Sequence, residues 1–259
     1  MPAIIPIPAF SDNYIWLIGE GRDAAVVDPG DAAPVLERLA RDGLELCAII
    51  ATHHHNDHVG GVPRLLERFH VPVFGPANES IPGRTHALRE GDAIEVPKLG
   101  TRFRVLDIPA HTAGHIAFVG DVEGPVVFCG DTLFTAGCGK LFEGTAEQMW
   151  HALSKLALLP DDTRVYCGHE YTLSNLRFAH TVEPDNAALN ARIARDTATR
   201  NRGEPTVPST MADERATNPF LRAALPEVKA AAEAHAGRPL PDAVASFATL
   251  RAWKNEFRG

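Results

Sequence analysis

Short hydrophobic runs separated by Gly, Pro and Asp turns fill the first two-thirds of the chain. Alternating or fully apolar runs predict β-strands there, and apolar residues at helical spacing predict helices between them. The expected strands are 13–19, 24–30, 45–51, 71–75, 101–110, 124–131 and 164–168, and the expected helices are 33–43, 63–69 and 145–159. Because strands and helices alternate, with polar clusters at strand ends, this pattern predicts a layered α/β/β/α sandwich with a site along one rim of its sheets.

The pattern changes near residue 172. Beyond it Val, Ile and Gly become rarer, whereas Ala, Arg and Asn become more frequent. This composition predicts a smaller helical part with a long loop at 201–220, and its expected helices are 173–181, 185–200, 226–236 and 242–257. We therefore expect an α/β domain over residues 1–172 and a helical domain over residues 173–259.

Composition and charge narrow the class of protein. The chain has 259 residues, a formal net charge of −8 and no block of Lys or Arg, so nucleic acid is not an expected partner. No apolar run approaches the ~18 residues of a membrane-spanning helix, and the N-terminus lacks the basic start of a signal peptide. The scattered cysteines do not predict a disulfide framework. We expect a cytoplasmic monomer with no membrane partner.

The densest group of candidate ligands is THHHNDH at residues 52–58. It offers His53, His55, Asp57 and His58 directly after the buried strand at 45–51. Imidazole and carboxylate are ligand types for zinc, iron or manganese. A helix would not bring all four to one side, whereas a loop at a strand end can aim them at a common volume.

Further donors argue for a second ion, because a catalytic zinc site uses about three protein ligands. Three candidates each follow a β-type run and a small residue, namely His111, Asp131 and His169. Asp131 is a natural bridge, since a carboxylate can bind two cations. Two ions about 3.5–4 Å apart could share a hydroxide formed at neutral pH. The sequence therefore predicts a two-metal site.

Other polar residues near these motifs have more than one interpretation. Asp28 is either a turn residue or an acceptor that orients a ligand histidine. His115, four residues after His111, is a candidate for contact with a ligand. The remaining histidines are expected to have no role at the site; they are His70, His86, His151, His180 and His235.

The ligand motifs resemble those of the metallo-β-lactamase superfamily, which has HxHxDH followed by a later His, an Asp and a final His. Within it, the chain resembles the glyoxalase II, or hydroxyacylglutathione hydrolase, family nearly from end to end. The segments that carry the resemblance are FSDNYIWLI (10–18), THHHNDHVGG (52–61), PAHTAGHI (109–116), GDTLFTAGCGKLFEGT (130–145), CGHEYTLSNLRFA (167–179), TNPFLR (217–222) and LRAWKNEF (250–257).

The resemblance implies a four-layered αββα metallo-β-lactamase sandwich with a dinuclear site, followed by a helical glutathione-binding domain. It assigns one divalent ion to His53, His55 and His111 and the other to Asp57, His58 and His169, with Asp131 bridging. The ions are expected to be zinc, with iron or manganese as alternatives. On this division His54 has no metal and should point away, into packing or a hydrogen bond.

The family's reaction splits S-D-lactoylglutathione into glutathione and D-lactate, the second step of methylglyoxal detoxification. A hydroxide that bridges the metals attacks the thioester, so Asp131 and Asp57 are candidate catalytic residues, with Asp57 assisting proton transfer. The family's substrate contacts map to Lys140, Phe142, Tyr171, Arg251 and Lys254. Phe142 is a departure, because many members have Tyr there, and it removes one hydrogen bond to glutathione.

The motifs leave two alternatives to a hydrolase. A glutathione persulfide dioxygenase of the same superfamily uses one iron, and a metal-binding protein without catalysis is the non-enzyme alternative. The complete second set of donors and the helical C-terminal part favour the hydrolase. A β-lactamase, lactonase or nuclease of this fold is less consistent with the GCGK segment (137–140) and the acidic charge.

Overall fold

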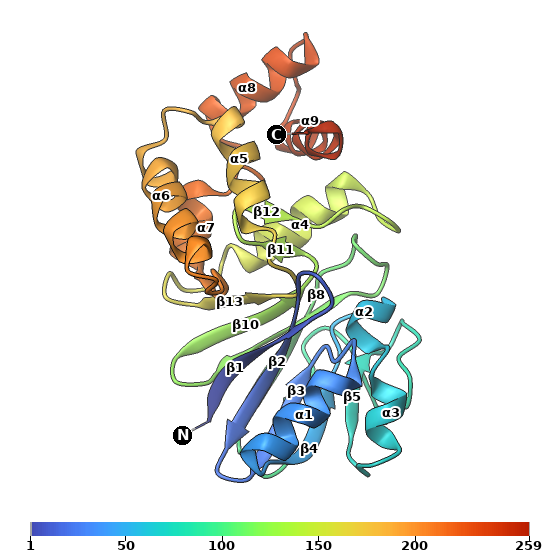
Figure 1. Cartoon of the computed structure of the whole chain (residues 1–259). Helices are drawn as coiled ribbons and strands as arrows, with labels where there is room; N and C mark the ends of the chain where they lie inside the picture. The colour runs from blue at the N-terminus through green and yellow to red at the C-terminus, as the bar shows by residue number, and fades with distance from the viewer. Residues whose placement is uncertain (1, 259) are drawn as a thin grey trace.

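The computed structural model describes residues 2–258 and confirms the layered sandwich (Figure 1). Two six-stranded sheets form its centre within that range. Strands of the first sheet run antiparallel from β1 to β3 and parallel from β3 to β6. In spatial order they are β1 (Ala3–Ala9), β2 (Asn13–Glu20), β3 (Asp23–Val27), β4 (Glu45–Ile50), β5 (Val73–Pro76) and β6 (His86–Leu88).

The second sheet is antiparallel except where β10 and β13 run parallel. Its spatial order is β14 (Ser209–Thr210), β13 (Arg164–Cys167), β10 (Pro125–Gly130), β9 (Ile116–Asp121), β8 (Arg102–Asp107) and β7 (Ala93–Glu95). A two-stranded hairpin, β11 (Leu133–Phe134) and β12 (Gly137–Cys138), follows β10. The second strand of this hairpin, β12, forms the first half of the GCGK segment (137–140).

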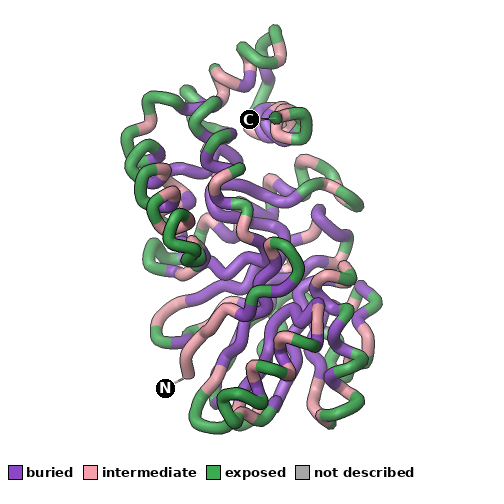
Figure 2. Tube along the Cα trace, in the orientation of Figure 1, coloured by how far each residue is buried: buried purple, intermediate pink, exposed green. Residues whose placement is uncertain are grey.

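Helices cover the outer faces of both sheets. Helix α1 (Ala32–Asp42) and α3 (Val62–Leu66) pack on the first sheet, where one apolar cluster joins them to the outward side chains of β2, β3 and β4. Helix α4 (Ala146–Leu156) packs on the second sheet in the larger central cluster. Figure 2 shows the consequence, with buried strands inside and exposed helical surfaces outside.

Local sequence explains the ends of the predicted helices. Asp31 caps the start of α1, and Gly43 ends it with φ 65°, the left-handed conformation that favours glycine. Thr145 and Gln148 form a capping box at the start of α4, since each side chain accepts a hydrogen bond from the other residue's backbone N–H.

The C-terminal part is helical, as expected, and is joined to the sandwich by a shared core. Phe247 and Leu250 of α9 belong to the same apolar cluster as Met149 and Leu153 of α4. The hydrophobic core therefore continues across residue 172. The helices are α5 (Thr172–Val182), α6 (Ala187–Asn201), α7 (Met211–Thr217), α8 (Pro226–Ala236) and α9 (Ala243–Glu256).

The predicted secondary structure was wrong in one stretch and missed several strands. The predicted loop at 201–220 contains β14 and α7, because Thr210 caps a helix inside this polar and proline-containing stretch. The sequence pattern also did not predict β6, β7, β9, β11 and β12, nor β1, which contains Pro6 and Pro8. These prolines are tolerated because β1 is an edge strand. Among residues 2–258, no helix is long and apolar enough to cross a membrane.

Candidate metal centre and substrate pocket

The predicted donors come together at the rim where β4, β10 and β13 end. His53 and His55 lie in the loop after β4, but Asp57 and His58 belong to the short helix α2 (Asn56–Val59). The motif is therefore half loop and half helical turn, where a loop alone was expected. Asp131 follows β10 and His169 follows β13, two neighbouring strands of the second sheet.

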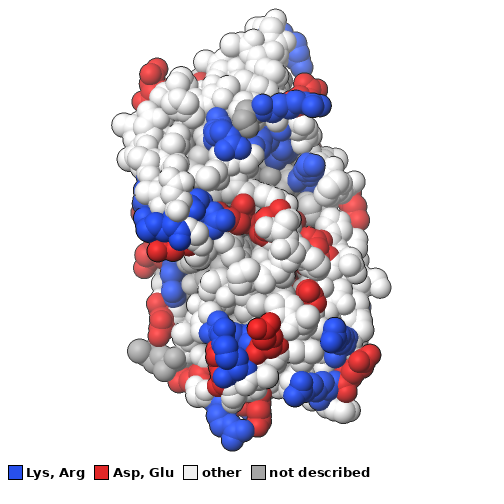
Figure 3. Space-filling view, in the orientation of Figure 1, with Lys and Arg blue, Asp and Glu red and all other residues white. Residues whose placement is uncertain are grey.

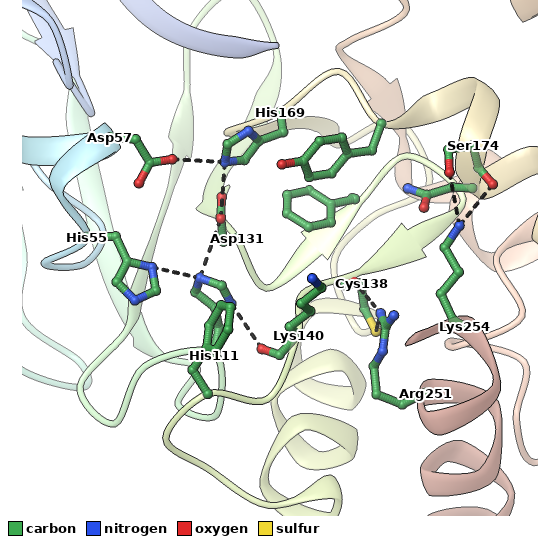
Figure 4. A pocket seen from close by; sticks show the side chains of 14 residues that line it. His55, Asp57, His111, Asp131, Cys138, Lys140, His169, Ser174, Arg251 and Lys254 are labelled. Carbon is green, nitrogen blue, oxygen red and sulfur yellow. Dashed lines mark hydrogen bonds and ion pairs between the residues drawn. The ribbon is translucent and has the colours of Figure 1, made fainter. Parts of the chain in front are cut away.

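One group of donors consists of three imidazoles, His53, His55 and His111, hereafter the first group. Nδ1 of His55 lies 3.2 Å from Nε2 of His53. The same atom lies 3.0 Å from Nε2 of His111 (Figure 4). Each nitrogen thus faces another nitrogen at short range. A cation between them would bind all three lone pairs.

A second group contains Asp57, His58 and His169. Oδ2 of Asp57 lies 3.5 Å from Nε2 of His58 and 3.4 Å from Nε2 of His169. The backbone comes close here, because a Cβ at Gly168 would lie 2.5 Å from Cε1 of His58. Glycine is therefore needed before His169, as the small residue at this position suggested.

Asp131 lies between the two groups. Its Oδ2 is 3.4 Å from Nε2 of His111 and 3.2 Å from Nε2 of His169, and its Oδ1 is 3.3 Å from Nε2 of His58. Both Oδ1 of Asp131 and Nε2 of His58 are buried without a hydrogen-bond partner. Buried polar atoms normally have partners. The donor set therefore fits two metal ions that share Asp131.

Hydrogen bonds behind the histidines fix which nitrogen faces inward. Nδ1 of His111 lies 3.0 Å from the Lys140 carbonyl, and Nδ1 of His53 lies 3.0 Å from the Thr52 hydroxyl. Nδ1 of His58 lies 3.0 Å from a carboxylate oxygen of Asp28. Each partner can accept a proton from Nδ1, which leaves Nε2 free to bind a metal.

Both interpretations of Asp28 are correct. It has φ 53°, a left-handed turn conformation, and its carboxylate is buried beside His58. It also accepts hydrogen bonds from the backbone N–H and the hydroxyl of Thr52, each at 2.8 Å. Asp28, His53 and His58 come close enough to form a third possible donor group. The Asp28 oxygens are already hydrogen-bonded, so this residue acts as an orienting acceptor.

Sequence reasoning missed Asp12 and Asn13, at the tip of the β1–β2 hairpin. Oδ1 of Asp12 lies 2.7 Å from Nδ1 of His169, and the Asn13 amide donates to Oδ2 of Asp57 at 3.0 Å. The hairpin is held there by backbone hydrogen bonds from Tyr14 N to Gly168 O and from Glu170 N to Asp12 O. The available signal was FSDNYIWLI, which had no assigned role.

His115 contacts the site without joining either group. Its Nε2 accepts a hydrogen bond from the backbone N–H of Asp131 at 3.1 Å, and its ring stacks on His53 at 4.5 Å. Its Nδ1 lies 3.1 Å from the Ile116 carbonyl. This buried imidazole therefore supports the position of the shared carboxylate.

The two groups differ in their protonation. Burial lowers the pKa of His53 well below the ordinary value, and burial is also the main cause of the lowered pKa values of His55 and His111. Burial has the same tendency at His58, but Asp131 and Asp28 outweigh it and its pKa lies well above the ordinary value. At His169 burial is again outweighed, mainly by Asp131, and its pKa rises to about 10.

A pocket of about 530 Å³ opens beside these groups (Figure 4). The metal-ligand candidates form one end, and Lys140, Arg251 and Lys254 lie toward the other. Aromatic side chains lie between, among them Tyr171, which stacks on His169 with ring centroids 4.7 Å apart. Figure 3 shows Lys and Arg side chains gathered at the level of α5 and α9, above acidic side chains. The pocket thus has a local positive end despite the net charge of −8.

The predicted substrate residues differ in how freely they face this pocket. Phe142 is exposed and contacts the rings of His55 and His111 edge-on. Arg251 is only 5% exposed, and its guanidinium donates to the Cys138 carbonyl at 2.7 Å. Nζ of Lys254 donates to the carbonyl and the hydroxyl of Ser174 at 2.9 and 3.2 Å. Arg251 therefore also holds β12, next to Lys140.

His54 points away from both donor groups, as expected. Its Nδ1 lies 3.1 Å from a carboxylate oxygen of Glu79, and its Nε2 lies 3.4 Å from one of Glu143. The other histidines considered unrelated to the site are outside the pocket lining.

Comparison with known proteins places the chain in a family. A family model described as metallo-beta-lactamase superfamily matches residues 9–169, and one described as hydroxyacylglutathione hydrolase C-terminus matches residues 170–257. The hydroxyacylglutathione hydrolase of Alkalilimnicola ehrlichii is 62% identical over 99% of this chain and 100% of that protein. That of Cupriavidus taiwanensis is 57% identical over the whole of both chains.

Among solved structures, ETHE1 from Myxococcus xanthus has a TM-score of 0.65 and 26% identity, with 98% of each chain covered. TTHA1623, solved in a di-iron-bound form, has a TM-score of 0.53 and 32% identity over 64% of this chain and 91% of that chain. The fold, both family models and the close relatives agree. The chain therefore belongs to the hydroxyacylglutathione hydrolase family, within the metallo-β-lactamase superfamily.

Proposed function

We propose that the protein hydrolyses S-D-lactoylglutathione and related S-2-hydroxyacylglutathiones to glutathione and the free hydroxy acid. The observation that carries this proposal is one pocket with two donor groups joined by Asp131 at one end and cations at the other. A glutathione thioester needs this arrangement, because its reacting carbonyl and its two carboxylates lie apart. Relatives that match the whole chain carry the corresponding name.

For the metal centre we propose that the first group holds one ion, that Asp57, His58 and His169 hold the other, and that Asp131 bridges. When bound, such ions polarise a carbonyl, stabilise the developing oxyanion and provide hydroxide at neutral pH. The donors suit zinc, iron or manganese. We propose zinc, and the di-iron-bound form of TTHA1623 supports iron as the alternative.

Lys140 and Lys254 supply the positive charge for the two carboxylates of glutathione, with Arg251 behind them. Tyr171 and Phe142 line the path between the cations and the donor groups, where the thioester would lie. In this placement the side chains orient the substrate so that its acyl carbonyl reaches Asp131 and its neighbours. Orientation of this kind lowers the entropic part of the barrier.

We propose that Asp57 assists proton transfer during the reaction. Its side chain is 42% exposed, so it can exchange protons with solvent. Its pKa lies below the ordinary value, chiefly because of the hydrogen bond with His169. It therefore faces the pocket as a carboxylate that can accept hydrogen bonds. The departing glutathione thiolate needs little acid assistance, because thiol pKa values are about 8.5.

We propose the same division of labour for the two parts of the chain. Residues 1–172 would supply the metal centre, and residues 173–259 would supply part of the glutathione site through α5 and α9. We also propose that the protein acts as a monomer.

The test is hydrolysis of S-D-lactoylglutathione by the purified protein, followed through loss of the thioester, with metal analysis of the same sample. We expect turnover that a chelator removes and added Zn²⁺ restores. Absence of turnover in protein loaded with two ions would refute the proposed function. Oxygen consumption with glutathione persulfide, without thioester hydrolysis, would support the dioxygenase instead.

A further inference from the structure

His54, the residue in the ligand motif that faces neither donor group, lies between two carboxylates. Its Nδ1 is 3.1 Å from Oε2 of Glu79, and its Nε2 is 3.4 Å from Oε1 of Glu143. The Glu79 side chain is only 2% exposed. In the described part of the chain, Oε2 of Glu79 has no hydrogen bond and pairs only with His54. His54 is therefore the one polar neighbour, among the described residues, of a buried carboxylate oxygen that has no hydrogen bond.

The two carboxylates hold one short turn, residues 112–114, immediately after His111. Oε1 of Glu79 accepts hydrogen bonds from the Thr112 hydroxyl and from the backbone N–H of Gly114, the latter at 3.0 Å. Oε2 of Glu143 accepts from the backbone N–H of Ala113 at 2.7 Å. A Cβ at Gly114 would lie 2.6 Å from Cγ of Glu79, so the turn and Glu79 are in close contact.

This turn is directly connected both to the first donor group, through His111, and to residues 140–143 at the edge of the pocket. Nδ1 of His111 lies 3.0 Å from the Lys140 carbonyl, and the His111 ring contacts Phe142 with centroids 5.2 Å apart. Phe142 precedes Glu143 in the chain. Any displacement of Glu143 or of the 112–114 turn is therefore expected to move His111, Lys140 and Phe142 relative to one another.

We propose that His54 is a positioning residue which, through Glu79 and Glu143, fixes the 112–114 turn against residues 140–143. The contacts of His54 with Glu79 and Glu143 thereby set the orientation of His111 and the position of residues 140–143 at the edge of the pocket. His54 itself does not bind metal. The part of this inference that concerns substrate rests on the proposed thioester hydrolysis, whereas the part that concerns His111 does not.

The experiment compares His54→Leu with His70→Leu, the same change at an exposed histidine away from the site. Both variants are prepared with Zn²⁺ and with Co²⁺. We expect His54→Leu to retain two ions per chain, to shift the Co²⁺ d–d absorption because the His111 geometry changes, and to raise KM for S-D-lactoylglutathione about fivefold, the size of effect typical of losing one polar contact. His70→Leu should match the unmodified protein in all three measurements.

Two conservative variants separate the contact of His54 with Glu79 from its contact with Glu143. The side-chain amide nitrogen of asparagine lies near the position of Nδ1 of histidine, so His54→Asn should keep the contact with Glu79. The side-chain amide nitrogen of glutamine lies near the position of Nε2 of histidine, so His54→Gln should keep the contact with Glu143. Each is expected to give a KM between those of the unmodified protein and His54→Leu, and they serve as the test if His54→Leu does not fold.

An unchanged KM together with an unchanged Co²⁺ spectrum in His54→Leu, or in both conservative variants, would overturn the proposal. Loss of an ion equal to that in His55→Leu would also overturn it, because His54 would then be a ligand. If the unmodified protein does not hydrolyse the thioester, the proposed function fails, whereas the Co²⁺ spectra still decide whether His54 positions His111.

Discussion

The two donor groups differ in composition and in the residues behind them. The first group consists of three imidazoles, two of which are backed by neutral oxygens, the Thr52 hydroxyl and the Lys140 carbonyl. The second group includes Asp57, and its imidazoles are backed by the carboxylates of Asp28 and Asp12. Negative charge is thus concentrated around the second group.

This difference implies that the two sites are unequal. Burial lowers the pKa values of the imidazoles of the first group, whereas the pKa of His58 lies well above the ordinary value and that of His169 is about 10. An ion entering the second group must displace protons, but it then meets more negative charge. A carboxylate behind an imidazole also makes that imidazole a more basic ligand. The second site should therefore depend more on its surroundings than the first.

The largest effect is expected from Asp131→Ala, which removes the residue common to both groups. Activity should fall by more than about a hundredfold, since changes even to outer partners of a metal site can cost that much. Metal analysis should show fewer than two ions, with both sites weakened. Two tightly held ions in this variant would show that the groups are independent and that Asp131 is not a bridge.

Asp12→Ala should separate the two groups. It removes the carboxylate that accepts a hydrogen bond from Nδ1 of His169, a residue of the second group. We expect affinity for one of the two ions to fall about 10- to 100-fold while the other ion stays bound. Isothermal titration of the metal-free variant with Zn²⁺ would measure both steps.

The control for Asp12→Ala is Ser11→Ala, which removes only an exposed hydrogen bond to Asp12. It should keep both binding steps. Equal weakening of both steps in Asp12→Ala would contradict the separate environments of the two groups.

A change at the opposite end of the pocket should leave both groups filled. Lys254→Met removes a cation proposed to bind a glutathione carboxylate, and we expect KM to rise about tenfold with little change in kcat. Loss of an ion in this variant would contradict the separation between the metal end and the cationic end.

The same lysine predicts a pH dependence. Burial, with help from the nearby Arg251 and Arg177, lowers the pKa of Lys254 to about 8. The side chain is positively charged below this pKa and neutral above it, so KM should increase as the pH rises through about 8. A pH series of KM on the unmodified protein and on Lys254→Arg, which keeps its charge, is the measurement. Parallel profiles for the two proteins would argue against Lys254 as the titrating group.

The smallest effect is expected from Phe142→Tyr, which restores the residue common in the family. One added hydrogen bond contributes about 0.5–1.5 kcal/mol, so KM should fall about two- to tenfold. Phe142 touches His55 and His111 of the first group, but the phenol adds no ligand to either site. The Zn²⁺ content should therefore stay the same. A changed Zn²⁺ stoichiometry would show that residue 142 affects metal binding by the first group.

The fold and the seven metal-ligand candidates could be predicted because each signal is local. His53, Asp131 and His169 each follow a strand, and the ends of strands in a layered α/β fold meet at one rim. Asp12 could not be assigned, because its contact with His169 joins residues 157 positions apart and depends on how the hairpin folds over β13. The partners of His54 were equally hidden, since Glu79 lies in the connection after β5. Arg251 shows a further limit, because its position predicted substrate contact but not its hydrogen bond to Cys138.

We infer that two unequal sites, joined by Asp131, act together on one thioester. The most direct test is to titrate the metal-free protein with Zn²⁺ while measuring both bound metal and hydrolysis of S-D-lactoylglutathione. We expect two distinguishable binding steps, with activity that reaches its maximum only as the second equivalent binds. Full activity at one equivalent, with no gain from the second, would contradict this inference.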